Sequence, residues 1–299
     1  MNRKVVGIAV VVLWSVGLGL LYKRNGKHSP QQLLAEAGMR VSPDTYYYML
    51  QQSGTQVGAA SSSVDTTKQR IVAVDFVRGT IPIAGKVVKL EARSEARFTR
   101  GMRLRDFVVR AVGDFTPFMI RGVMQDEDTD KTLRITSMDG KRRPVTQESV
   151  PQQPVFIPTV APIPLMLKGE PKIGDSIAVA VFNPLSRSVH AAMLRIQADS
   201  LFLVPDSAAF DSTSGRWVKA HQSSIRGWRI GSDAPGLIVW VDIAGRLLAA
   251  AEPSGISLSR TTFELSFSNW TLDHSPSADS ARAKSVAAST RPKTRPAKN

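Results

Sequence analysis

The acidic run Asp126–Asp130 is the segment whose residue types come closest to a metal site. Oxygen-bearing side chains alternate there as they do at the start of a calcium-binding loop. However, Lys131 stands where such a loop needs a glycine, and Ser137 stands where it needs a bidentate glutamate. The pattern therefore favours a solvated hairpin tip, and we predict neither a metal ion nor a cofactor.

Residues for nucleophilic or zinc chemistry lack the spacing that such chemistry needs. The chain has no cysteine, which excludes disulfides, thiolate metal sites and a cysteine nucleophile. Its histidines lie far apart, at His28, His190, His221 and His274, and no serine stands in a G-x-S-x-G elbow. The glycines of Gly54–Gly58 predict a hairpin turn, because no strand-to-helix switch follows them. We therefore expect a protein that is not an enzyme, with a hydrolase using unrecognised carboxylates as an alternative.

A basic segment from Lys86 to Arg110 carries the clearest binding signal. Eight cations there accompany only three carboxylates, Glu91, Glu95 and Asp106. The candidates for contacts with an anionic partner, such as lipid headgroups, are Lys89, Arg93, Arg97, Arg103 and Arg105. Cross-strand or diagonal ion pairs that absorb much of this charge are the favoured interpretation, and an exposed face that meets an anionic partner is the alternative. We expect no nucleic-acid binding, since no aromatic side chains are interleaved with these charges.

The elements that position these residues are predicted to be strands. Apolar or small side chains alternate with charged ones from Val88 to Thr99, a period of two that is typical of a strand with one solvated face. Further strands are predicted over 46–51, 57–64, 71–77, 104–112, 118–124, 132–138, 177–182, 192–198, 200–204, 225–230, 237–241, 246–251 and 261–269. The pairs Ser53-Gly54, Asp139-Gly140, Ser214-Gly215 and Ala244-Gly245 predict turns between several of them. The fold class is therefore mainly β, with an antiparallel meander.

Two segments depart from the strand pattern. Ser29, Pro30 and Gly38 have the spacing of an N-cap, a first helical residue and a residue beyond the end of a short helix. The segment 150–171 contains Pro151, Pro154, Pro158, Pro162, Pro164 and Pro171. Such a density of proline is incompatible with a central strand, so we predict a crossover between two groups of strands. Within it, Ile163–Leu167 is predicted to form an apolar plug or a single helical turn.

The N-terminal run Val5–Tyr22 contains no charged side chain and is predicted to be a transmembrane anchor. As a helix it would be about 27 Å long, close to the hydrocarbon thickness of a bilayer. A cleaved signal peptide is the alternative, but its apolar core is usually shorter and no small-residue cleavage site follows this run. The basic residues on its two sides nearly balance, so charge alone does not fix its orientation.

Charge and composition separate the two ends of the chain from its body. The net charge of +14 is concentrated partly in residues 273–299, which are rich in Ala, Ser, Pro, Arg and Lys. Such a composition predicts a disordered basic tail. The predicted organisation is an N-terminus (1–4), an anchor (5–22), a juxtamembrane linker with a short helix (23–43), a β domain (44–272) and the tail (273–299).

Two segments carry a resemblance to a known family. One is Tyr46-Tyr47-Tyr48 with Gly54–Gly58, and the other is Leu237–Arg246 with Gly255 and Ser259–Leu265. Together they resemble the extracytoplasmic N-terminal β-domain of bacterial transglutaminase-like proteins, and more loosely the periplasmic domain-of-unknown-function 3108 proteins. The resemblance covers residues 44–270 and implies a curved antiparallel sheet or open half-barrel outside the cytoplasm. The catalytic cysteine of that enzyme family has no counterpart here, so no catalytic residue is carried over.

The apolar run predicts a membrane protein with a single span, and the resemblance implies a cytoplasmic N-terminus (1–4) and a periplasmic body at the cell inner membrane. We expect a non-enzymatic binding module for a lipid, lipoprotein or other hydrophobic ligand. The alternative is an accessory subunit of a larger membrane complex. A carrier needs an unfilled apolar cavity, whereas a subunit needs a filled core with an exposed patch.

Overall fold

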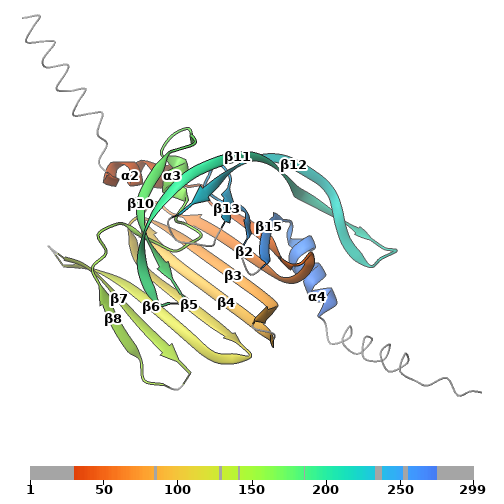
Figure 1. Ribbon diagram of the computed structural model, residues 1–299, viewed down its shortest axis with the longest axis horizontal. Coiled ribbons are helices and arrows are strands. Elements are labelled where there is room, and N and C mark those ends of the chain that lie inside the picture. Colours follow the sequence, from red (N-terminus) through yellow and green to blue (C-terminus); the bar gives the residue numbers. More distant parts are fainter. Residues whose placement is uncertain are drawn as a thin grey trace, which may run out of the picture.

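The protein is described by a computed structural model over residues 30–274, except 84–85, 128–129, 141, 185, 233–237 and 252–254. It is a mainly β structure in which fifteen strands form one sheet (Figure 1). The first eight are β1 (Asp44–Gln52), β2 (Thr55–Thr66), β3 (Arg70–Ile83), β4 (Lys86–Thr99), β5 (Leu104–Gly113), β6 (Phe115–Glu127), β7 (Asp130–Asp139) and β8 (Val145–Ser149). The others are β9 (Val155–Phe156), β10 (Ser176–Asn183), β11 (Ser188–Asp211), β12 (Arg216–Gly231), β13 (Ile238–Val241), β14 (Leu247–Ala251) and β15 (Ile256–Thr261).

The order of the strands is β8-β7-β6-β5-β4-β3-β2-β1-β15-β14-β13-β12-β11-β10-β9. The chain begins in the middle at β1, builds outward to β8, crosses to the opposite edge at β9 and returns to β15 beside β1. Neighbouring strands pair antiparallel, apart from the short parallel pair of β9 with β10. The predicted antiparallel meander is thus confirmed.

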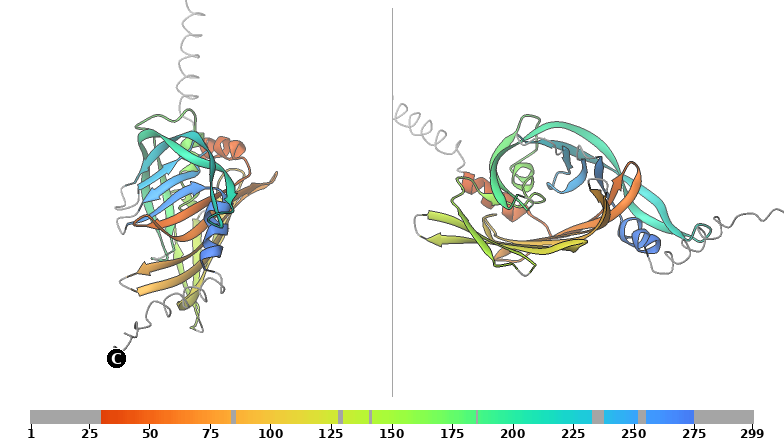
Figure 2. Two further views of the ribbon diagram at one scale, coloured as in Figure 1. Left: turned by 90° about the vertical axis from the view of Figure 1, so that its right-hand side faces the viewer. Right: turned by 60° about the horizontal axis from the view of Figure 1, so that its bottom comes forward.

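The sheet curls so that strands from its two ends face each other across one interior. The rings of Phe107 in β5 and Phe182 in β10 lie 4.3 Å apart, and those of Phe98 in β4 and Phe156 in β9 lie 5.9 Å apart. All four side chains are fully buried in the main core. The right-hand view of Figure 2 looks along this curl, with β10 and β11 across from the β4–β6 side. Among the described residues β8 and β9 do not pair, so the sheet is open.

The proline-rich segment is a crossover between two groups of strands, as predicted. It leads from the edge strand β8 to the opposite edge strand β9 and contains helix α3 (Ile163–Leu167). Proline occupies the start of this helix, where a missing N–H is tolerated. Ile163, Leu165 and Met166 are buried in the main core, so α3 is the apolar plug of the sheet.

Helix α2 (Pro30–Arg40) runs beyond the predicted end. Gly38 was expected to follow the helix but lies inside it, at a buried position. A Cβ atom there would lie 1.9 Å from the carbonyl oxygen of Arg100, so this glycine permits close packing against the β4–β5 turn. Arg40 Nη1 also donates a hydrogen bond to the carbonyl oxygen of Leu167, 3.1 Å away, which ties α2 to the plug. The predicted N-cap, Ser29, is outside the described residues.

Two features of the strand prediction need correction. The segments 192–198 and 200–204 are strand as predicted, but the break between them is absent, because both belong to the long β11, which pairs with β12 along a hairpin containing local irregularities. The strand predicted over 261–269 was wrong. Residues 261–269 are mostly helical, with the π-helical turn η1 (Glu264–Ser268) followed by α4 (Asn269–Asp273). The aromatic rings here repeat at helical spacing, and they pack on the outward face of the sheet. The ring of Phe263 lies 5.3 Å from that of Tyr47, and the ring of Phe267 lies 6.0 Å from that of Phe76.

The predicted anchor Val5–Tyr22 and residues 275–299 of the predicted tail are outside the described residues. Within the described ranges, no helix combines the length and the apolar character needed to cross a membrane.

Candidate functional site

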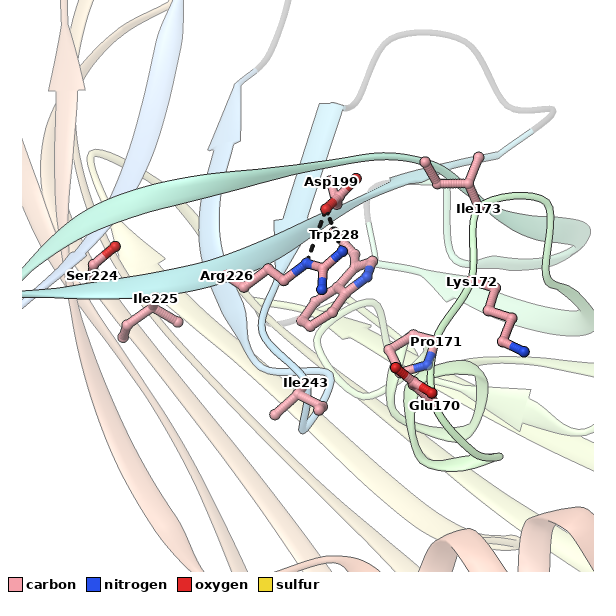
Figure 3. A pocket seen from close by; sticks show the side chains of 10 residues that line it. All are labelled: Glu170, Pro171, Lys172, Ile173, Asp199, Ser224, Ile225, Arg226, Trp228 and Ile243. Atoms are coloured by element: carbon pink, nitrogen blue, oxygen red, sulfur yellow. Dashed lines mark hydrogen bonds and ion pairs between the residues drawn. The ribbon is translucent and has the colours of Figure 1, made fainter.

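A cleft of about 680 Å³ lies under the base of the β11–β12 hairpin (Figure 3). Three segments distant in sequence form it: the hairpin, the turn between β13 and β14, and the loop that follows α3. Its lining residues are Glu170, Pro171, Lys172, Ile173, Asp199, Ser224, Ile225, Arg226, Trp228 and Ile243. The cleft combines an aromatic ring, aliphatic side chains and a few charges, which is the usual make-up of a small-molecule site.

Trp228 places an indole ring at the inner end of this cleft. It belongs to β12, where Ile230 is buried in the same core cluster two residues later. Alternation therefore puts Arg226 and Ser224 on the same face of the strand as Trp228, and the intervening Ile225 also lines the cleft (Figure 3). Asp199 of β11 is directly opposite Trp228 in the hairpin register.

An ion pair caps the indole. Arg226 Nε and Nη2 lie 2.9 and 2.7 Å from Asp199 Oδ2, and the guanidinium carbon lies 5.4 Å from the centre of the Trp228 ring. The guanidinium is therefore neutralised by a carboxylate and also lies within cation–π distance of the ring. Trp228 itself is only 5% exposed, so the ion pair covers most of the indole and forms a polar edge of the cleft.

Large apolar side chains are exposed around the cleft. Ile173 is 63% exposed on one side and Ile243 is 60% exposed on the other. Along the hairpin, Leu201 lies opposite Arg226 and Leu203 lies opposite Ser224, and these leucines are 72% and 70% exposed. The apolar surface thus continues from the cleft along one face of the hairpin.

A buried carboxylate fixes the turn that presents Ile243. Asp242 Oδ1 accepts the backbone N–H groups of Ala244 and Arg246, each at 2.9 Å. Its Oδ2 accepts a hydrogen bond from Arg260 Nη1 at 2.8 Å. Because both carboxylate oxygens are occupied, the turn is held to β15 and Ile243 is presented at a fixed position.

Further ionisable groups lie inside the sheet but do not line the cleft. Asp75 of β3 accepts hydrogen bonds from Ser62 at 2.7 Å, Ser94 at 3.0 Å and Thr159 at 2.7 Å. Burial raises the pKa of Asp75, although these hydroxyl donors act in the opposite direction. Since Thr159 belongs to the crossover, Asp75 links the plug to the wall of the sheet.

Tyr46 and Arg246 also have shifted pKa values inside the sheet. Burial, aided by a hydrogen bond to Asp44, raises the pKa of Tyr46 to about 12. Burial lowers the pKa of Arg246, whose Nη2 donates to the Ser42 carbonyl oxygen at 3.0 Å. These contacts hold strands together, and we assign these groups a structural role.

The five predicted anion contacts are exposed but do not form one cluster. Arg97 is neutralised on both sides, by Glu95 at 2.8 Å and Asp106 at 3.2 Å. Lys89 lies toward the start of β4, whereas Arg103 and Arg105 lie at its other end, around the β4–β5 turn. Arg93 lies opposite Arg110 in the β4–β5 register. Sequence reasoning did not single out Arg110, because its position across the hairpin depends on the turn geometry.

The predicted hairpin around Asp126–Asp130 is present, with Glu127 of β6 paired with Asp130 of β7. Within the described part of the chain, no group of three or more potential ligands is placed to hold a metal ion.

The described histidines make local contacts. His221 Nδ1 lies 2.8 Å from both carboxylate oxygens of Asp206, and the His274 ring stacks on Trp270 at 3.6 Å. His190 Nε2 lies 2.7 Å from the Ser188 hydroxyl at the exposed start of β11. This last contact has the composition of a nucleophile and a base, but neither residue lines the cleft.

No protein-family model matches the chain, and no curated protein matches it, so the resemblances drawn from the sequence do not assign it to a family. One solved structure is similar, described as a beta-barrel-like protein of domain of unknown function DUF1849 from Brucella abortus. The match has 14% sequence identity and a TM-score of 0.47, and it covers 74% of this chain and 96% of that one.

Proposed function

We propose that this protein is a non-enzymatic binding module that holds the apolar part of a hydrophobic ligand, such as a lipid, in the cleft under the β11–β12 hairpin. The observation that carries the proposal is a hollow of about 680 Å³ that contains Trp228 and is flanked by Ile173 and Ile243. Leaving these aliphatic side chains in water forgoes favourable burial, which a bound acyl group would supply.

The charges of the cleft suit an amphipathic ligand. Asp199 and Arg226 neutralise one another, so the inner end bears no net charge, while Glu170 and Lys172 lie in the loop at the side. A ligand could thus place its chain against Trp228 and its polar group among these side chains. Catalysis is not favoured, because Asp199 is engaged by Arg226 and the lining includes no histidine to activate Ser224.

Location at the inner membrane, with the body in the periplasm, is part of the same proposal. It rests on the uncharged run Val5–Tyr22, which has the length of a membrane span. An anchored module of this kind would take its ligand from the adjacent bilayer or pass it on there.

A second candidate function, an accessory subunit of a membrane complex, is favoured by the exposed face of the hairpin. Leu201 and Leu203 lie on it, and the sheet interior below is already filled by α3. A protein partner seated on the leucines would bury them, as an interface core does.

A photoreactive lipid tests the first proposal. The full chain, in membranes, is labelled with palmitic acid that carries a diazirine, and labelled peptides are identified by mass spectrometry. We expect label on the peptides that contain Trp228 and Ile243. Replacing both rim residues, Ile173→Asp and Ile243→Asp, should lower this labelling by about tenfold, as expected for losing the burial of two aliphatic contacts.

The matched control is Val145→Asp in the edge strand β8, where an exposed apolar residue lies outside the cleft. This variant should be labelled like the wild type. Cleft labelling that survives the double substitution would contradict the lipid proposal. A membrane protein that co-purifies in stoichiometric amount, and is lost with Leu201→Asp and Leu203→Asp, would instead support the subunit.

A further inference from the structure

The outward face of the sheet brings together arginines that the sequence keeps apart. Arg93 of β4 and Arg110 of β5 are directly opposite each other in the antiparallel register. Arg121 of β6 is paired with Val108, which places it diagonally across from Arg110. All three side chains are exposed. Directly opposite residues in such a pair have Cβ atoms about 5 Å apart, so both guanidinium groups are within reach of one ligand between them.

These arginines lack the carboxylate partners that neutralise their neighbours. Glu95 and Asp106 both bind Arg97, at 2.8 and 3.2 Å, and Glu91 is directed to Arg78 at 3.9 Å. Over the described residues, Arg93, Arg110 and Arg121 take part in no ion pair. Arg110 instead directs its Nε toward the sulfur of Met119, 3.5 Å away.

A small hollow adjoins the facing pair. It has a volume of about 90 Å³ and is lined by Arg93, Glu95, Arg97, Asp106, Val108 and Arg110. Its three arginines and two carboxylates leave a net charge of +1. Both carboxylates bind Arg97, so the N–H groups that no carboxylate engages belong to Arg93 and Arg110.

We propose that Arg93, Arg110 and Arg121 form a binding site for a phosphate group on the outward face of the sheet. Like charges placed opposite each other destabilise a sheet, and an oxyanion between them removes this repulsion. The planar guanidinium fork matches the oxygens of a phosphate and can donate to it in bidentate fashion. Free phosphate compounds and lipid headgroups share this chemistry.

This site is separate from the proposed ligand cleft. Its residues belong to β4, β5 and β6, whereas the cleft is built from β11, β12 and the segments around them. The phosphate proposal can therefore fail while the cleft proposal stands.

Thermal unfolding of the full chain in a neutral detergent tests the site, with pyrophosphate as the probe and sodium chloride at equal ionic strength as the reference. Pyrophosphate should stabilise the wild type. The double variant Arg93→Gln/Arg110→Gln should bind it at least about tenfold more weakly, because each lost charge-assisted pair is a strong one. Without pyrophosphate this variant should unfold at or above the wild-type temperature, since a repulsion has been removed.

The control Arg134→Gln/Arg216→Gln removes the same charge from arginines that are paired with Glu148 and Asp273. It should keep the wild-type response to pyrophosphate. The proposal is overturned if pyrophosphate stabilises the Arg93→Gln/Arg110→Gln variant as much as the wild type, or stabilises neither.

Two further probes identify the source of the phosphate group. These are inorganic phosphate and monomeric dihexanoyl phosphatidylglycerol, with dihexanoyl phosphatidylcholine as the zwitterionic comparison. Stabilisation by phosphatidylglycerol alone assigns the site to an anionic lipid headgroup, and stabilisation by inorganic phosphate assigns it to free phosphate compounds. Absence of both responses overturns the proposal.

Discussion

Arg260 donates a hydrogen bond to Asp242 across 2.8 Å, and the two side chains are only 6% and 10% exposed. The guanidinium carbon of Arg260 also lies 3.9 Å from the centre of the Tyr46 ring. The pair therefore joins the β13–β14 turn to β15 and β1, which lie next to each other where the two halves of the sheet meet.

Replacing Asp242→Ala should lower the free energy of unfolding by about 3–5 kcal/mol, because it leaves the Arg260 charge buried without its partner. Equilibrium urea unfolding followed by tryptophan fluorescence measures the loss. Glu148→Ala, which removes a partner from the exposed pair with Arg134, should lower it by no more than about 1 kcal/mol. Equal effects of the two substitutions would show that burial of the Arg260 pair is unimportant.

Gly122→Ala should destabilise the protein by about 1–3 kcal/mol through overpacking. A Cβ atom at Gly122 would lie 2.1 Å from the ring of Phe107, which is itself held against Phe182 across the interior. Phe107→Leu removes the ring edge that would clash. In a double-mutant cycle by urea unfolding, Gly122→Ala should therefore be less damaging when it is combined with Phe107→Leu than in the wild type. Additive effects of the two substitutions would contradict the close packing of Gly122 against the Phe107 ring.

Gly245→Ala should destabilise the protein by about 1–3 kcal/mol more than Gly215→Ala. Both glycines have positive φ angles, +74° and +65°, so both substitutions strain the backbone. Only at Gly245 would the added Cβ meet other atoms, 2.6 Å from the Cα of Ile163 in the plug, whereas the space at Gly215 is open. The difference between the two variants in the free energy of unfolding, measured with urea, isolates this contact. That difference would vanish if the plug were not packed under the turn.

The free energy of unfolding of the Asp75→Asn variant, relative to that of the wild type, should increase as the pH rises from about 4 to about 8. The folded protein raises the pKa of Asp75, chiefly by burial, so folding favours the protonated carboxyl. Its contribution to stability is therefore fully present below the pKa of the unfolded chain and is lost as the pH rises through the raised pKa of the folded state. Asparagine does not ionise and escapes this loss. Urea unfolding at a series of pH values measures the difference, and a constant difference would refute the assignment.

Local patterns in the sequence predicted most of the strands. The alternation from Val88 to Thr99 lies within β4, and Ser53-Gly54 lies between β1 and β2 as expected. Asp139 is the last residue of β7, and Gly140 follows it with a positive φ angle. The prolines of 150–171 correctly indicated a crossover, and Ile163–Leu167 forms its helical turn. These features depend on side-chain period and backbone freedom within a few residues, which a sequence displays directly.

The segment around Phe263 shows where local patterns failed. A short apolar run is compatible with a strand or a helix. Here the segment is helical, and its aromatic side chains pack on the outward face of the sheet. Phe267 stacks there on Phe76, which is far away in sequence.

Residue types and their spacing were sufficient to predict the class of the fold, the antiparallel pairing of successive strands, the plug and the surplus of positive charge. These follow from residue type and spacing along neighbouring stretches of chain. In contrast, the cleft that Trp228, Ile173 and Ile243 share, and the position of Arg93 opposite Arg110, are seen only in the folded protein. The reason is that both arrangements depend on strand register and on the curl of the sheet, which arise from contacts between distant segments.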